Sequence, residues 1–203
     1  MCMNNSMCGC SSNNVCENFG PFLAVDAACI TPTKVTTGSI IPFASGISPV
    51  VLATIASGLI DTVSIVGFGS AFPGVSLVGN NIDLTLVGTE AFNAPRAGTI
   101  TAISASFSVL AAITVAGTVT IRAQVYRADA GSNIFSPTTA LVDLIPSLTT
   151  FAVGTFASGT TNVTPVPVAA GDRLVMVFSA TAAGIAPLVN VIEGNGSAGI
   201  TIE

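Results

Sequence analysis

The sequence has little charge and lacks residue types that many enzymes and nucleic-acid-binding proteins need. Only 7% of its 203 residues are charged, histidine and tryptophan are absent, and lysine and arginine together number five. Without histidine, neither Ser–His nor Cys–His nucleophile pairs can form. Because the arginines are scattered and there is no basic patch, binding to nucleic-acid phosphates is disfavoured. We therefore expect no enzyme activity, no cofactor and no nucleic-acid partner.

The aspartates keep one catalytic alternative open, because two of them could meet in space as an acid–base pair. Most stand beside turn residues, which favours turn or capping roles instead. They are Asp61, Asp83, Asp129, Asp143 and Asp172. The loop at residues 129–133 has oxygen ligands for calcium but lacks the spacing of an EF-hand, so a plain hairpin loop is favoured. Arg122 and Arg127 could pair with acids of another subunit or lie in solvent or at a sheet edge.

Three long stretches lack any charge and would pass a hydropathy test for transmembrane helices. These are residues 35–60, 97–121 and 144–171. Their β-branched residues suit strands better than helices, and proline and glycine interrupt them. No Lys/Arg cluster flanks them to set a membrane orientation. We expect β-strands and no membrane span.

Cysteine is absent from the last 174 residues, and all five cysteines fall within the first 29. They are Cys2, Cys8, Cys10, Cys16 and Cys29. An odd number leaves at least one cysteine unpaired within a monomer, which favours intersubunit disulfides. Two alternatives stay open. One is a metal site, although the cysteine spacing differs from that of structural zinc sites; the other is a disordered tail with free thiols.

The apolar composition of the chain also favours assembly. Hydrophobic residues make up 50% of the chain and its net charge is −5. So little charge gives little repulsion between copies, and a monomer with such a surface would be poorly soluble. The composition therefore predicts self-assembly, with copies of this chain as the main partners.

The clearest strand signal is a strict alternation over residues 118–127. Val119, Ile121, Ala123 and Val125 share one face, and the other face carries Thr118, Thr120, Arg122, Gln124 and Tyr126. Residues 174–178 are a continuous apolar run, as expected of a strand buried on both faces. Further predicted strands span residues 61–68, 82–87, 99–109, 149–156, 188–192 and 198–202, with a hairpin turn at 194–197. Residues 48–59 suit either a short helix or a strand.

Many short strands without an amphipathic helix predict an all-β protein, with an antiparallel jelly-roll or β-sandwich body at residues 37–203. Residues 1–36 form a separate cysteine-rich arm and bridge. The bridge carries the apolar residues Phe22, Leu23, Val25 and Ile30. An extended arm of this kind can add a strand to the exposed sheet edge of a neighbour.

The body resembles the carboxy-terminal domain of the BclB-type exosporium glycoproteins of endospore-forming bacteria. The similar stretches are residues 38–46, 66–70, 94–101 and 174–184. The resemblance spans about residues 37–203 and implies a structural module of the spore surface. In that family the domain usually follows a collagen-like Gly-X-Y region, and this chain has no such repeat.

The cysteine arm is similar in style to the amino-terminal connectors of the Ena endospore appendage subunits. The resemblance lies in Cys8-Gly9-Cys10, Cys16 and the later Cys29. It implies disulfides from the arm to other subunits of a fibre. Together the two resemblances imply a jelly-roll subunit of a covalent appendage, with other exosporium or spore-coat proteins as further partners. The alternative is a trimeric exosporium module that mediates adhesion.

The start of the chain bears on where such a subunit would be made. There is no basic n-region and no apolar h-region before residue 19, so a secretory signal is not expected. With the resemblance to spore-surface proteins, this predicts synthesis in the mother-cell cytoplasm and deposition on the spore surface.

Overall fold

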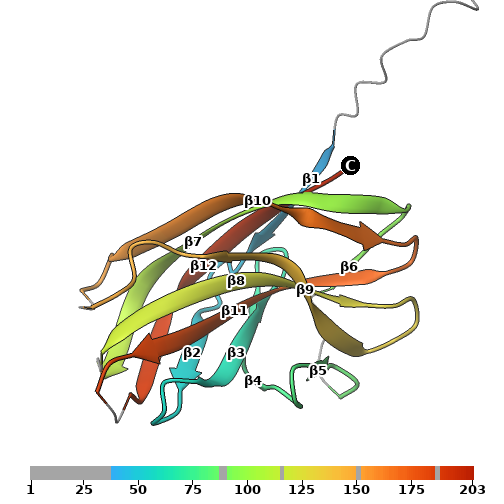
Figure 1. Cartoon of the computed structure of the whole chain (residues 1–203). Helices are drawn as coiled ribbons and strands as arrows, with labels where there is room; N and C mark the ends of the chain where they lie inside the picture. Colours follow the sequence, from blue (N-terminus) through green and yellow to red (C-terminus); the bar gives the residue numbers. More distant parts are fainter. Residues whose placement is uncertain (1–37, 87–90, 115–116, 150–151, 186–187) are drawn as a thin grey trace, which may run out of the picture. The chain divides into compact units, whose positions relative to one another are not determined.

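The computed structural model describes residues 38–86, 91–114, 117–149, 152–185 and 188–203. Within these ranges the chain forms β-strands and no helix, which confirms the all-β prediction (Figure 1). The strands are β1 (Ser39–Ala44), β2 (Val50–Thr54), β3 (Ile60–Val66), β4 (Ala71–Ser76), β5 (Ile82–Asp83), β6 (Phe92–Asn93), β7 (Gly98–Thr114), β8 (Thr118–Ala128), β9 (Ile134–Asp143), β10 (Phe156–Val168), β11 (Arg173–Ala183) and β12 (Asn190–Ile202). The arm at residues 1–36 lies outside the described residues.

One layer of the fold is centred on β12. Its first edge pairs with β7, and β10 pairs with the far edge of β7. Its second edge is divided, because β2 pairs with Asn190–Gly194 and β1 pairs with Ser197–Ile202. All of these pairings are antiparallel. Among the named strands, β1 pairs with β12 alone, so β1 is an edge strand of this layer.

The other layer is centred on β11, which lies between β8 on one side and β3 and β6 on the other. Strand β9 extends this layer beyond β8. The two layers join through the β2–β3 hairpin and through a bridge between Ile145 and Ser158. The result is the predicted antiparallel sandwich of the jelly-roll type (Figure 1).

The main core lies between the inner faces of these layers. Phe107 of β7 and Phe178 of β11 meet there with ring centroids 6.3 Å apart, and both side chains are almost fully buried. Val119, Ile121 and Val125 of β8 add to this core, as their alternation predicts. Burial of apolar surface at about 25 cal/mol per Å² is the main stabilising contribution to such a core.

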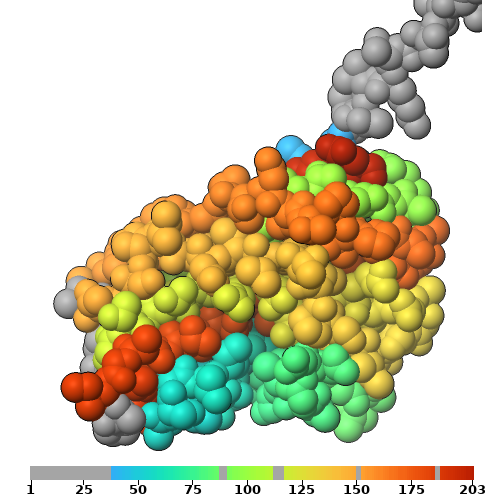
Figure 2. Space-filling view, viewed as in Figure 1, coloured from blue at the N-terminus to red at the C-terminus, as the bar shows by residue number. Residues whose placement is uncertain are grey.

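A second apolar cluster lies on the opposite face of β11. Leu174, Met176 and Phe178 enter the main core, whereas Val175 and Val177 enter the second cluster. This confirms the predicted burial of the run on both faces. The segment of β4 and β5 pairs with β3 and β9 and supplies Ile82 to the cluster. Figure 2 shows that segment in green, between β3 and β9.

Tyr126 departs from the predicted polar face of β8. It is only 6% exposed, because the second cluster covers the far end of that face. Burial raises the pKa of the Tyr126 hydroxyl above its ordinary value. The alternation rule placed Tyr126 on the correct face, but it did not predict that another segment would cover that face.

Several predicted elements near turn residues were wrong. Residues 194–197 are not a hairpin turn, because β12 runs unbroken through them. The strand expected at 149–156 does not form over residues 152–155, since Thr155 N donates to Ala152 O (2.9 Å) in a turn and β10 begins only at Phe156. The strand expected at 82–87 ends at Asp83, whose carboxylate accepts bonds from the Thr85 hydroxyl and N–H; these lower its pKa.

Five strands were missed, namely β1, β4, β6, β9 and β10, and all of them except β6 contain proline. Pro42 lies in the edge strand β1, and Pro165 and Pro167 lie in β10, whose one named strand partner in the described chain is β7. Pro73 and Pro137 lie where the registers of β4 and β9 shift. A proline has no N–H to donate, so edges and bulges are the positions that accept it. Residues 48–59, left open by the sequence, contain strand β2.

Candidate assembly edge between β1 and β6

The outer edge of β1 carries backbone groups that its own layer does not use. Just after β1, Ser45 N donates to Gly196 O of β12 at 2.9 Å. Ala44 bonds on the other edge, where its N–H donates to Gly67 O and its carbonyl accepts from Gly69 N, each at 2.8 Å. Backbone groups of a strand point to the same edge at every second residue. Ile40 and Pro42 therefore face away from β12, and no described residue bonds to the backbone of Ile40 or to the Pro42 carbonyl on that side.

An apolar groove lies beside this edge, between β1 and β6, and encloses about 240 Å³. We call it the β1–β6 groove; it is lined by Ser39, Ile41, Phe92, Ala94, Pro95, Arg96 and Ile202. Ile41 and Ile202 are each 7% exposed, so they form an apolar floor that solvent barely reaches. Arg96 is the charged residue of the lining and lies 3.5 Å from the Ser39 hydroxyl.

Aromatic side chains continue from the groove along the same edge. Phe68 is 54% exposed, stacks on Phe43 at 5.5 Å and lies 6.4 Å from Phe92. On the outer face of β1, Ile40 is 75% exposed. An unpaired strand edge flanked by exposed apolar side chains is a typical site for strand addition.

Strands β9 and β10 also border a hollow, of about 410 Å³, but they are poor sites for strand addition. Pro137, Pro165 and Pro167 line it and remove three backbone donors. Arg127 also donates to the Pro167 carbonyl at 2.8 Å. Of the two hollows, the β1–β6 groove is the better site for an added strand.

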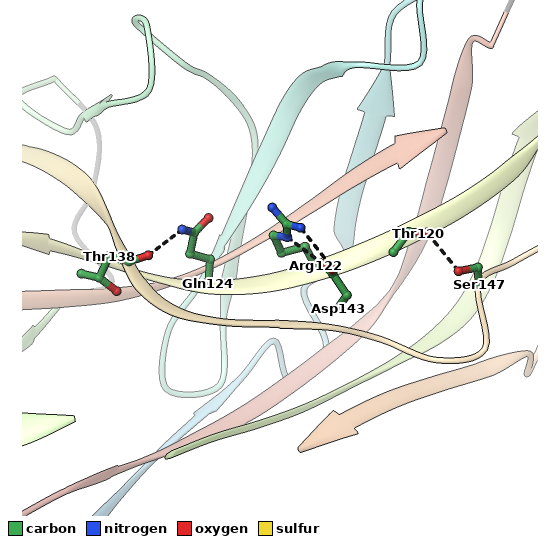
Figure 3. Close-up of polar contacts among 6 residues, drawn as sticks. All are labelled: Thr120, Arg122, Gln124, Thr138, Asp143 and Ser147. Atoms are coloured by element: carbon green, nitrogen blue, oxygen red, sulfur yellow. Dashed lines mark hydrogen bonds and ion pairs between the residues drawn. The ribbon is translucent and has the colours of Figure 1, made fainter. Parts of the chain in front are cut away.

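The polar face of β8 is paired within the chain (Figure 3). Arg122 holds Asp143 through two bonds of 2.6 and 2.9 Å, and these bonds raise the pKa of Arg122. Gln124 donates to the Thr138 carbonyl at 2.7 Å, and the hydroxyls of Thr120 and Ser147 lie 3.0 Å apart. This pairing stabilises β9 against β8 and gives Arg122 an acid of its own chain.

The oxygens of the 129–133 loop bind an arginine of the same chain. Arg173 donates to Ser132 O at 2.9 Å and to the Asn133 side chain. The loop simply joins β8 to β9, as the hairpin interpretation predicts. In the described part of the chain, no three or more Asp, Glu, His or Cys side chains lie together in a group able to hold a metal.

Asp172 and Asp129 lie on either side of Arg127, each at 3.5 Å. Asp172 is only 3% exposed, and its carboxylate accepts the Ala169 N–H at 2.8 Å in the turn before β11. This is the turn role that its position after Gly171 predicts. Arg127, like Arg122, therefore finds its acids within the chain.

Replacing Asp172 by alanine should lower the free energy of unfolding by about 1–3 kcal/mol, because the Ala169 N–H and Arg127 lose an acceptor that is almost fully buried. Asp143→Ala is the matched control, since its ion pair is about half-exposed and should contribute at most about 1 kcal/mol. Urea denaturation of the reduced protein, followed by circular dichroism, measures both. Equal losses for the two variants would contradict the structural role given to Asp172.

The five predicted disulfide residues, Cys2, Cys8, Cys10, Cys16 and Cys29, lie outside the described residues, so their pairing stays a prediction. Sequence reasoning did not find the β1–β6 groove, because it assigned neither β1 nor β6 as a strand. Ile40 and Ile41, just before Pro42, were the only available signal. Within the described ranges, no helix is long and apolar enough to cross a membrane.

No protein-family model matches this chain. It is 39% identical over 156 residues to "Collagen-like protein 1" of Acanthamoeba polyphaga mimivirus, an alignment that covers 71% of this chain and 16% of that protein. This chain therefore corresponds to a small part of its relative. A solved structure of Eiger TNF from S. frugiperda aligns with 82% of this chain and 93% of its own, at a TM-score of 0.38 and 11% identity.

The relative supports the coarser part of the sequence interpretation. A homologue of this chain is a collagen-like protein, as the resemblance to collagen-linked domains predicts. The assignment to the BclB-type domain and the resemblance of the arm to Ena connectors stay predictions.

Proposed function

We propose that this chain is a self-assembling structural subunit of a spore-surface fibre of the endospore-appendage type. Its amino-terminal arm docks onto neighbouring copies, and disulfides through Cys2, Cys8, Cys10, Cys16 and Cys29 make the joints permanent. The subunit is made in the mother-cell cytoplasm and acts at the spore surface. Other exosporium or spore-coat proteins are further partners at its ends.

The observation that carries this proposal is the unpaired edge of β1 beside an apolar groove, in a chain that also has a thiol-rich arm. Exposed apolar side chains elsewhere on the body fit burial against neighbours. Ile47, Leu86 and Ile185 are each at least 94% exposed. Apolar contacts would hold subunits first, and oxidation would then prevent their release.

Replacing all five cysteines by serine should abolish the covalent polymers, because no disulfide can then link two copies. The measurement is electrophoresis of boiled samples without reductant. The unaltered chain should form high-mass species that collapse to monomer on reduction, and the serine variant should run as monomer in both conditions. If the unaltered, oxidised chain runs only as monomer without reductant, the covalent-fibre proposal fails.

A second candidate is a trimeric surface module that mediates adhesion. The observation that favours it is the homology to a collagen-like protein, since collagen helices bring three chains together. Sedimentation under oxidising conditions separates the two candidates. A discrete trimer supports the module, and a broad series of larger species supports the fibre.

A further inference from the structure

We propose that residues 22–25 of a second copy add to β1 as an antiparallel strand and place Phe22 in the β1–β6 groove. This inference rests on the proposed function and names the docking site of the arm. It assigns a position on the body to a segment that lies outside the described residues. Three features of the edge select both the segment and its register.

The first feature is the apolar floor of the groove. Ile41, Phe92 and Ile202 line a space open to one large apolar side chain. Among the first 37 residues, the run Phe22-Leu23-Ala24-Val25 combines an aromatic with three further apolar residues, and it contains no charge. Aromatic side chains contribute the most when buried against other aromatics, so Phe22 fits beside Phe92.

The second feature is the set of unpaired backbone groups. With Phe22 opposite Ile41, Leu23 stands opposite Ile40, and its N–H and C=O can bond to both free groups of that residue. The Leu23 side chain then lies on the same outer face as the exposed Ile40, which gives an apolar cross-strand pair. This register explains an exposed isoleucine that the isolated body leaves in solvent.

The third feature is proline. In this register Pro21 of the added strand stands opposite Pro42 of β1, and neither can donate a backbone hydrogen bond. The ladder therefore ends at this pair, so the added strand is short. The named strand pairs of the body are all antiparallel, and the added strand follows the same orientation.

A second copy is a better source of this strand than the same chain. If the chain's own residues 22–25 docked, residues 26–37 would have to form a twelve-residue loop back to Gly38. Loops between paired antiparallel strands usually have about 2–5 residues, so a loop of this length is unfavourable. A strand from another copy needs no such loop and links the two bodies.

Disulfide trapping tests the docking and its register in the full chain. In the background with all native cysteines changed to serine, one tagged copy carries Ala24→Cys and a differently tagged copy carries Ser39→Cys. Ala24 and Ser39 face each other in the proposed register, two residues beyond the Phe22–Ile41 pair. We expect mixed-tag disulfide dimers, formed about tenfold more than with Leu23→Cys, whose side chain faces outward.

Three results would overturn the docking site. The first is no excess of mixed dimers over the Leu23→Cys control. The second, with both cysteines in one chain, is a crosslink only within that chain. With the native cysteines retained, Phe22→Asp should reduce the polymer yield by about tenfold or more, whereas Phe22→Leu should not reduce it. The third overturning result is an unchanged polymer yield for Phe22→Asp. If the unaltered chain forms polymers but the Ala24→Cys and Ser39→Cys copies give no excess of mixed dimers, only this docking site is rejected. If the unaltered chain forms no polymers, the proposed fibre function is rejected as well.

Discussion

Replacing Phe178 by alanine should lower the free energy of unfolding by about 3–5 kcal/mol, a large part of the stability of a domain. Phe178 is fully buried in β11 and packs on Phe107 from the opposite layer. Its ring also lies against Gly196 of β12. Removing the ring leaves a cavity between two layers, and the strand pairing on both sides limits how far they can close it.

Guanidinium denaturation of the reduced protein, followed by far-ultraviolet circular dichroism, measures the loss. Phe156→Ala is the matched control, because Phe156 is 55% exposed at the start of β10 and should contribute less than about 1 kcal/mol. A loss for Phe178→Ala as small as that for Phe156→Ala would show that the layers do not pack through this pair.

The sequence predicted the fold class and the strongest strands because their apolar residues follow the period of a sheet. Residues 118–127 and 174–178 lie in β8 and β11, with the predicted inward residues in the core. The edge strands were not predictable in the same way. Their prolines read as breaks, and only the pairing partners show that the missing N–H groups lie at edges and bulges.

The candidate site depends on this unpredicted part of the fold. Its groove is formed by β1, by β6 and by the end of β12, which are far apart in the sequence. The alternation of apolar residues within one strand does not show which distant strands lie side by side. The arm was predictable, because a cluster of cysteines is visible in composition alone, but composition does not show which edge of the body would receive it.

The central glycines of β12 give the sharpest contrast between the sequence and the structure. The Gly-Asn-Gly-Ser run at residues 194–197 was interpreted as a turn, where glycine serves a positive φ. In β12 neither Gly194 nor Gly196 has a positive φ. Gly194 is there because a Cβ would collide with the Phe107 ring and the Ser108 carbonyl of β7. These glycines make room for the phenylalanines of the core.

Replacing Gly194 by alanine should therefore cost roughly 3 kcal/mol, near the upper end of ordinary overpacking penalties, because both the ring and the backbone must move. Gly199→Ala is the matched control in the same strand, since the nearest atoms to its added Cβ lie at 3.9 and 4.0 Å. That variant should be neutral or more stable by about 0.4–1 kcal/mol, because alanine restricts the unfolded chain. Thermal unfolding of both variants measures the difference. If Gly194→Ala costs as little stability as Gly199→Ala, β12 does not approach Phe107 as closely as described. The packing reason for glycine in this strand would then be wrong.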